Sequence, residues 1–222
     1  MLSTVDGPYA ETKDMYTVHI MLRREFRLLP ELVRGVAAGD EKRARIVADH
    51  IAILVELLGA HHHSEDVVLW PRLLDRAPDE VAPVVQLMEG HHTSMEKLDA
   101  EIESMLRAWR ENADPEQRRA LASTLDRLLL VLTEHTGLEE RLILPVVEKH
   151  ISKAEWEQMV AESGAGISPE RIPLIIGMMM YEGGLEIVPP EARDAMKDIG
   201  PQVYAAHSER VHGTATPVSA GV

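Results

Sequence analysis

The chain of 222 residues has no cysteine. This absence excludes disulfide bonds, iron–sulfur clusters, cysteine-based zinc sites and a cysteine nucleophile. Aromatic residues are also scarce, at 4 % with a single phenylalanine, although apolar residues together make up 45 %. A core built mainly from Leu, Val, Ile, Met and Ala suits packed helices better than strands. The composition therefore favours an all-α protein.

Basic residues are too few for a nucleic-acid surface, because the net charge is -14 and no basic stripe is present. Long apolar runs are missing as well: residues 174–181 are among the longest, far short of the roughly 20 needed to span a bilayer. Residues 1–7 contain no basic patch followed by an apolar run, as a signal peptide would. We expect a cytoplasmic protein that binds neither nucleic acid nor membrane.

Apolar residues recur at three- and four-residue spacing through most of the first 160 positions. They predict four long helices, over residues 10–36, 40–76, 79–112 and 114–150. Asp40 and Asp114 are candidate N-caps, and Pro115 suits the first position of a helix. Because the connections are short, we expect an up-down-up-down four-helix bundle within residues 1–163.

The composition changes after residue 163, where glycine and proline separate shorter segments. Two short helices are predicted, over residues 169–182 and 191–210. We interpret residues 164–222 as a helical extension packed on the bundle, with a frayed end from residue 213.

Nine of the eleven histidines fall within the four predicted long helices. The second and fourth helices share the pattern H-x3-E-[DE]-x4-P, in which His61 and His135 precede Glu65 and Glu139 by four residues. Residues i and i+4 lie on the same face of a helix. Each segment can therefore offer an imidazole nitrogen and a carboxylate to a common metal centre.

The other two helices continue the pattern. His19 lies 42 residues before His61, and His92 lies 43 residues before His135, as in a helical hairpin repeated twice. Carboxylates can bridge two ions and imidazoles can complete their coordination, a mixture that suits iron and, less specifically, manganese or zinc. The predicted metal ligands are His19, His61, Glu65, His92, His135 and Glu139.

With these residues the chain resembles the hemerythrin-like (HHE cation-binding) family over roughly residues 10–150. HHxxEDxxLWP at residues 61–71 and MEGHH at residues 88–92 add to the resemblance. It implies a four-helix bundle around a non-haem centre of two iron ions, bridged by the carboxylates and open to O2 at one position. A ferritin-like centre fits less well, because its Glu-x-x-His order is reversed here.

One departure from the oxygen-carrying members concerns a second histidine four residues after the ligand of the third helix. Glu96 stands there if His92 is the ligand, and Met95 if His91 is. Glu96, water or a group from elsewhere would then replace the missing nitrogen. Such a centre suits redox turnover, sensing or iron handling better than reversible oxygen carriage.

Several choices stay open at this point. Glu140 could take the place of Glu139, and His62 and His63 are expected near the rim of the site and in solvent. His50 is expected to be a core or cap histidine, since eleven residues put it about 16 Å from His61 along a helix.

The functional hypothesis is a di-iron protein that binds, senses or reacts with O2, peroxide or nitric oxide. The alternatives are an iron storage or sensing protein, and an oxidase or peroxidase acting on an unknown small substrate. The sequence points to no particular reductase or protein partner.

Overall fold

The computed structural model describes residues 7–188 and 190–215, and within them the chain is all-helical. The elements, with π- and 3-10 turns marked η, are α1 (Lys13–Arg34), α2 (Glu41–Ser64), η1 (Glu65–Leu69), α3 (Trp70–Arg76), α4 (Pro78–Trp109), α5 (Pro115–Leu142), α6 (Leu144–His150), α7 (Lys153–Ala165), η2 (Pro169–Arg171), α8 (Ile172–Gly183), η3 (Gly184–Ile187) and α9 (Pro190–His212). An isolated bridge joins Tyr9 to Ser152. The all-α prediction is confirmed.

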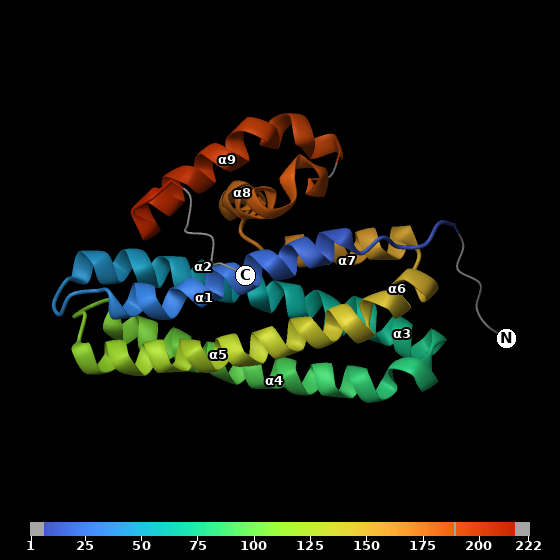
Figure 1. Ribbon diagram of the computed structural model, residues 1–222, viewed down its shortest axis with the longest axis horizontal. Coiled ribbons are helices and arrows are strands. Elements are labelled where there is room, and N and C mark those ends of the chain that lie inside the picture. The colour runs from blue at the N-terminus through green and yellow to red at the C-terminus, as the bar shows by residue number, and fades with distance from the viewer. Residues whose placement is uncertain (1–6, 189, 216–222) are drawn as a thin grey trace.

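Four long helical segments lie side by side along the longest axis of the molecule (Figure 1). They are α1, α2 continued by α3, α4, and α5 continued by α6, and successive segments run in alternate directions. Helix α5 packs on both α1 and α4, and α2 contacts α1 and α4. All four segments therefore border one common interior.

The predicted helix starts have the expected caps. The Asp40 side chain accepts a hydrogen bond from the backbone N–H of Arg43 at the start of α2. Asp114 accepts from two backbone N–H groups at the start of α5, where Pro115 occupies the first turn. Gly39 has φ +78°, which lets the chain turn sharply between α1 and α2.

The second and fourth predicted helices are each interrupted, at equivalent positions of the repeat. In the second, the backbone N–H of Trp70 bonds to the carbonyl of Glu65, an i→i+5 bond that makes η1 a π-helical turn. In the fourth, α5 ends at Leu142 and α6 starts at Leu144. Pro71 and Pro145 explain both interruptions, because proline lacks the N–H that a continuous helix needs.

Helix α7 is an element that the sequence interpretation missed. Ser152 and Glu155 form a capping box at its start, a signal that was readable from the sequence. It packs against α2 and η1. The two helices predicted in the extension are present as α8 and α9, which pack on each other and lie on the α1 and α2 side of the long segments (Figure 1). The expected fraying falls largely on residues 216–222, outside the described residues.

The apolar core consists of two parts separated by a polar layer. One part contains Phe26, Leu58 and Trp109, and the other contains Trp70 and Met88. On each long segment, the histidine predicted as a ligand lies between the residues that enter the two parts. The interior thus holds a layer of buried histidines and carboxylates with apolar packing at both ends.

Among the described residues, no helix is long and apolar enough to cross a membrane.

Candidate metal centre

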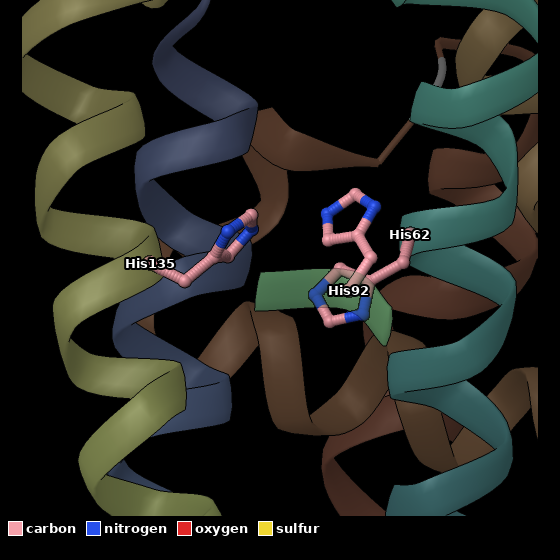
Figure 2. A group of neighbouring side chains, drawn as sticks. All are labelled: His62, His92 and His135. Atoms are coloured by element: carbon pink, nitrogen blue, oxygen red, sulfur yellow. The ribbon is translucent and has the colours of Figure 1, made fainter. Parts of the chain in front are cut away.

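The six predicted ligands meet in the polar layer, and a seventh side chain, His62, joins them. All seven are at least 95 % buried. Their donor atoms form two groups, in each of which the atoms lie within 4.8 Å of one another. One group is His62, His92 and His135, whose rings converge between α2, α4 and α5 (Figure 2). The other group is His19, His61, Glu65 and Glu139.

The two carboxylates connect these groups. Glu65 places Oε1 3.0 Å from Nε2 of His61 and Oε2 3.3 Å from Nε2 of His92. Oε2 of Glu139 lies 3.3 Å from Nε2 of His19 and 3.7 Å from Nε2 of His135. Each glutamate therefore faces one histidine of each group, which is the arrangement that a carboxylate bridging two cations needs.

The facing atoms lack hydrogen-bond partners in the described part of the chain. These buried atoms are Nε2 of His19, His61, His62, His92 and His135, and both carboxylate oxygens of Glu65 and Glu139. Buried polar atoms are nearly always paired, since leaving one unpaired costs about 1–3 kcal/mol. A concentration of nitrogen and oxygen donors directed at one interior space fits divalent metal ions.

A second acid orients one histidine in each half of the centre. Asp66 Oδ1 lies 2.8 Å from Nδ1 of His92, and Glu140 Oε1 lies 3.1 Å from Nδ1 of His19. A proton on each Nδ1 donates to the acid and leaves Nε2 as the free lone pair. The pattern E-[DE] in the repeat thus separates two tasks: the first acid faces the centre, and the second fixes a histidine from another helix.

The charges of the centre divide its histidines into two kinds. Burial alone lowers the pKa of His19, but the carboxylates of Glu139 and Glu140 outweigh burial and raise it to about 9. The pKa of His92 rises to about 10 in the same way, against burial, through Asp66 and Glu65. At neutral pH, and without a metal, these two imidazoles are protonated on both nitrogens and therefore positively charged.

The pKa values of the other three imidazoles shift downward, whereas that of Glu65 shifts upward. Burial, and then the charge of His19, lowers the pKa of His61 to about 3. Burial also lowers the pKa values of His62 and His135, which stand beside the cationic His92. Burial and the neighbouring Glu139 raise the pKa of Glu65 to about 8. Three imidazoles are therefore neutral at neutral pH.

His62 is where the sequence interpretation of the site was wrong. It was expected at the rim, but its ring is buried, with its centroid 4.2 Å from that of His92. The repeat concealed it, because the equivalent position of α5 holds Thr136, which accepts a hydrogen bond from Arg23 instead. The run of three histidines was the signal that could have revealed it.

The residue four positions after His92 does not face the centre. Glu96, the expected candidate for the missing nitrogen, is exposed to solvent. His62 occupies the interior beside His92, so α2 offers a nitrogen donor at this side of the centre. His63 is exposed, as expected, and His91 is half-buried.

A cavity of about 270 Å³ borders the centre at His61. Its walls come from α1, α2, α7 and α8 and are mostly apolar, with Met15, Val18, Ile175 and Met179 among them. The extension therefore forms one wall of an apolar chamber that reaches one of the candidate ligands.

Part of the chain matches the model of a known protein family. Residues 11–100 match the family model described as the hemerythrin HHE cation binding domain, which confirms the resemblance seen in the sequence. The matched segment includes His19, His61, Glu65 and His92, whereas His135 and Glu139 lie beyond it. Searches of curated proteins and of solved structures gave no match.

Proposed function

We propose that this chain, in which residues 11–100 match the hemerythrin HHE cation-binding domain, holds two non-haem iron ions and binds or reacts with O2, peroxide or nitric oxide. The long segments α1 to α6 would form the up-down-up-down bundle that encloses the ions. Residues 1–163 would house the centre, residues 164–222 would cover it, and the protein would work in the cytoplasm.

The observation that carries the proposal is the position of the two glutamates. Glu65 and Glu139 each face a histidine of both donor groups through atoms that have no hydrogen-bond partner among the described residues. His62, His92 and His135 would hold one ion, His19 and His61 the other, and both glutamates would bridge them. With both glutamates shared, the ion beside His19 and His61 would have one nitrogen donor fewer than the other ion, and this side of the centre borders the apolar cavity at His61.

Iron supplies electrons and an open coordination position when it is bound. The residues of the chain then have separate tasks. Asp66 and Glu140 orient His92 and His19, and the apolar chamber next to His61 excludes water and admits a small, weakly polar ligand. Manganese or zinc would fit the same donors, so the identity of the metal is part of the proposal.

Metal analysis and spectroscopy test this function. Iron is added anaerobically, the iron per chain is measured by mass spectrometry, and the absorption spectrum is recorded before and after exposure to O2, peroxide or nitric oxide. Wild type should show a spectral change, and Glu65→Ala should retain two fewer iron ions. Glu134→Ala is the control, because this glutamate lies on α5 next to His135 but is exposed. Equal iron content in Glu65→Ala and wild type would exclude the assignment.

The cavity supports a second candidate, an oxidase or peroxidase with a small apolar substrate. The chamber of about 270 Å³ is larger than a diatomic ligand requires and would hold a small apolar substrate. Ile175→Trp would fill the chamber from α8. Loss of turnover with iron content unchanged would support the enzyme, whereas an unaltered reaction with O2 would favour simple binding or sensing. An iron storage or sensing role would show metal-dependent stability without a reaction.

A further inference from the structure

A second cluster of buried histidine and carboxylate groups lies away from the centre, where α9 rests on the bundle. It consists of Glu25 from α1, His50 from α2 and His212 from the end of α9. Glu25 and His50 have fully buried side chains, and that of His212 is 9 % exposed. His50 lies eleven residues before His61, so this cluster cannot share the ions of the centre.

The donor atoms of the three side chains face one another. Oε2 of Glu25 lies 3.4 Å from Nε2 of His50 and 3.9 Å from Nε2 of His212. These three atoms are also the ones that have no hydrogen-bond partner within the described residues. Donors about 2.1 Å from a tetrahedral ion are roughly 3.4 Å apart. The separations in the cluster are close to that value and similar to those between carboxylates and histidines in the main centre.

Surrounding side chains fix two of the three donors. The other oxygen of Glu25 accepts hydrogen bonds from Arg24, at 2.6 Å, and from the hydroxyl of Tyr204, at 2.9 Å. Nδ1 of His50 lies 3.0 Å from Nε2 of His207. Such outer contacts on ligating residues are typical of metal sites, because they hold the donor atom in place.

The guanidinium of Arg24 does not occupy the carboxylate oxygen that faces the two imidazoles. The Arg24 guanidinium pairs with Glu182 as well as with Glu25. Arg43 and Arg210 add positive charge near the end of α9, but Arg24 contacts Oε1 of Glu25 and leaves Oε2 directed at the two imidazoles. Arg24 therefore does not block the carboxylate oxygen that would bind an ion.

We propose that Glu25, His50 and His212 form a mononuclear site for a divalent transition metal, separate from the di-iron centre. Two imidazoles and one carboxylate are the donor set of mononuclear Fe(II) and Zn(II) sites that keep open positions. Because α1 and α2 supply two donors and α9 supplies the third, a bound ion would tie the C-terminal extension to the bundle.

A chain of hydrogen bonds is the competing explanation of the same contacts. Arg210 can donate to Nδ1 of His207, which then donates through Nε2 to Nδ1 of His50, so that Nε2 of His50 carries a proton toward Glu25. Metal binding requires the reverse tautomer, with the proton on Nδ1 of His50. Arg210 is exposed and can turn away to permit it. The hydrogen-bonded relay from Arg210 to Glu25 does not involve Nε2 of His212, whereas a metal site uses this atom as a ligand. The position of His212 therefore favours a metal site.

The test uses the full chain, stripped of metal with a chelator and reloaded with Zn(II) alone. Zinc per chain is counted by mass spectrometry in wild type, Glu25→Gln and His212→Gln, with the exposed His63→Ala as control. Wild type and the control should retain one zinc more than either variant. Because the result is a difference between variants, it does not depend on how many ions the main centre holds.

A second measurement guards against a variant that fails to fold. Hydrogen exchange of α9 is followed in wild type and His212→Gln with and without Zn(II). Zinc should slow exchange in residues 200–212 of wild type by at least ten-fold and leave that segment of the variant unchanged. Equal zinc content in all four proteins, or equal effects of zinc on α9 in wild type and variant, would overturn the proposal in favour of the hydrogen-bonded relay.

Discussion

Asp66 places its carboxylate 2.8 Å from Nδ1 of His92, although the two residues belong to different helical segments. Asp66 directly follows Glu65, which faces Nε2 of the same ring. The imidazole is therefore held from both sides by consecutive acids of one helical turn, η1. The π-helical hydrogen bond in this turn widens the helix at the residues that perform these tasks.

Replacing Asp66 tests whether this contact orients a metal ligand. Asp66→Asn removes the charge that favours a proton on Nδ1, so the tautomer with a free Nε2 becomes less favourable. We expect metal affinity to fall by roughly 10–100-fold, the usual cost of losing such a partner. Competition with a chelator of known affinity measures the change, and Asp75→Asn, an exposed acid in α3, serves as the control. Equal affinities would show that Asp66 does not orient His92.

His62 and His63 form a matched pair of neighbours with opposite environments. His62 is buried beside His92 and His135, and His63 is exposed. We expect His62→Ala to lose one of the two ions proposed for the centre, or to bind it at least ten-fold more weakly, because one donor group would keep only two histidines. His63→Ala should retain the wild-type content. Metal analysis after equilibrium dialysis distinguishes them, and equal contents would show that His62 only packs.

The raised pKa of the Asp99 carboxyl group should make the folded protein less stable as the pH rises. Burial, followed by the charges of Glu103 and Glu96, raises the pKa of Asp99 to about 7 in the folded protein, from an ordinary value of 3.8. A carboxyl whose pKa is higher in the folded state binds its proton more tightly there. The folded state therefore loses stability between about pH 4 and pH 7, where only the unfolded chain has released this proton.

Asp99→Asn removes this loss with little change in shape. We expect a melting temperature higher than that of wild type by roughly 2–8 °C at pH 8, with the gain fading toward pH 4. Calorimetry across this pH range gives the comparison, and Glu111→Gln controls for removal of an exposed charge. A gain of the same size at every pH would contradict the stated cause.

Two helical glycines should respond to alanine in opposite directions. A Cβ added at Gly177 in α8 would lie 2.2 Å from the carbonyl oxygen of Gly200 in α9, whereas one at Gly90 would meet no described residue within 4 Å. Gly177→Ala must force α8 and α9 apart, at a cost of about 1–3 kcal/mol. Gly90→Ala should stabilise α4 by about 0.5–1 kcal/mol. Urea unfolding measures both, and similar effects would contradict the close contact of the helices.

The paired ligands on the second and fourth helices were predictable from the sequence. His61 with Glu65 and His135 with Glu139 follow from the helical period, because spacing of four residues places both donors on one face whatever surrounds the helix. Their repetition, with His19 and His92 in the intervening helices, predicted that four helices would share a centre. These relationships depend on local geometry, which a single sequence records.

The tertiary structure decided the relationships that local geometry leaves open. The side of a helix that is buried depends on all of the neighbouring helices. The interior position of His62 could not be predicted from the repeat, because the equivalent residue is Thr136. Glu139 faces Nε2 of His19 and Glu140 faces its Nδ1, and this difference depends likewise on where α1 places His19.

The cluster of Glu25, His50 and His212 shows the limit most clearly. These residues share no motif, and up to 187 positions of sequence separate them. In sequence, Glu25 is one of many acids on a helix, and His212 lies beyond the last predicted helix, which ends at residue 210. Helical periodicity fixed the side chains that face the same way along one helix, but only the packing of α9 on α1 and α2 could bring these three donors together.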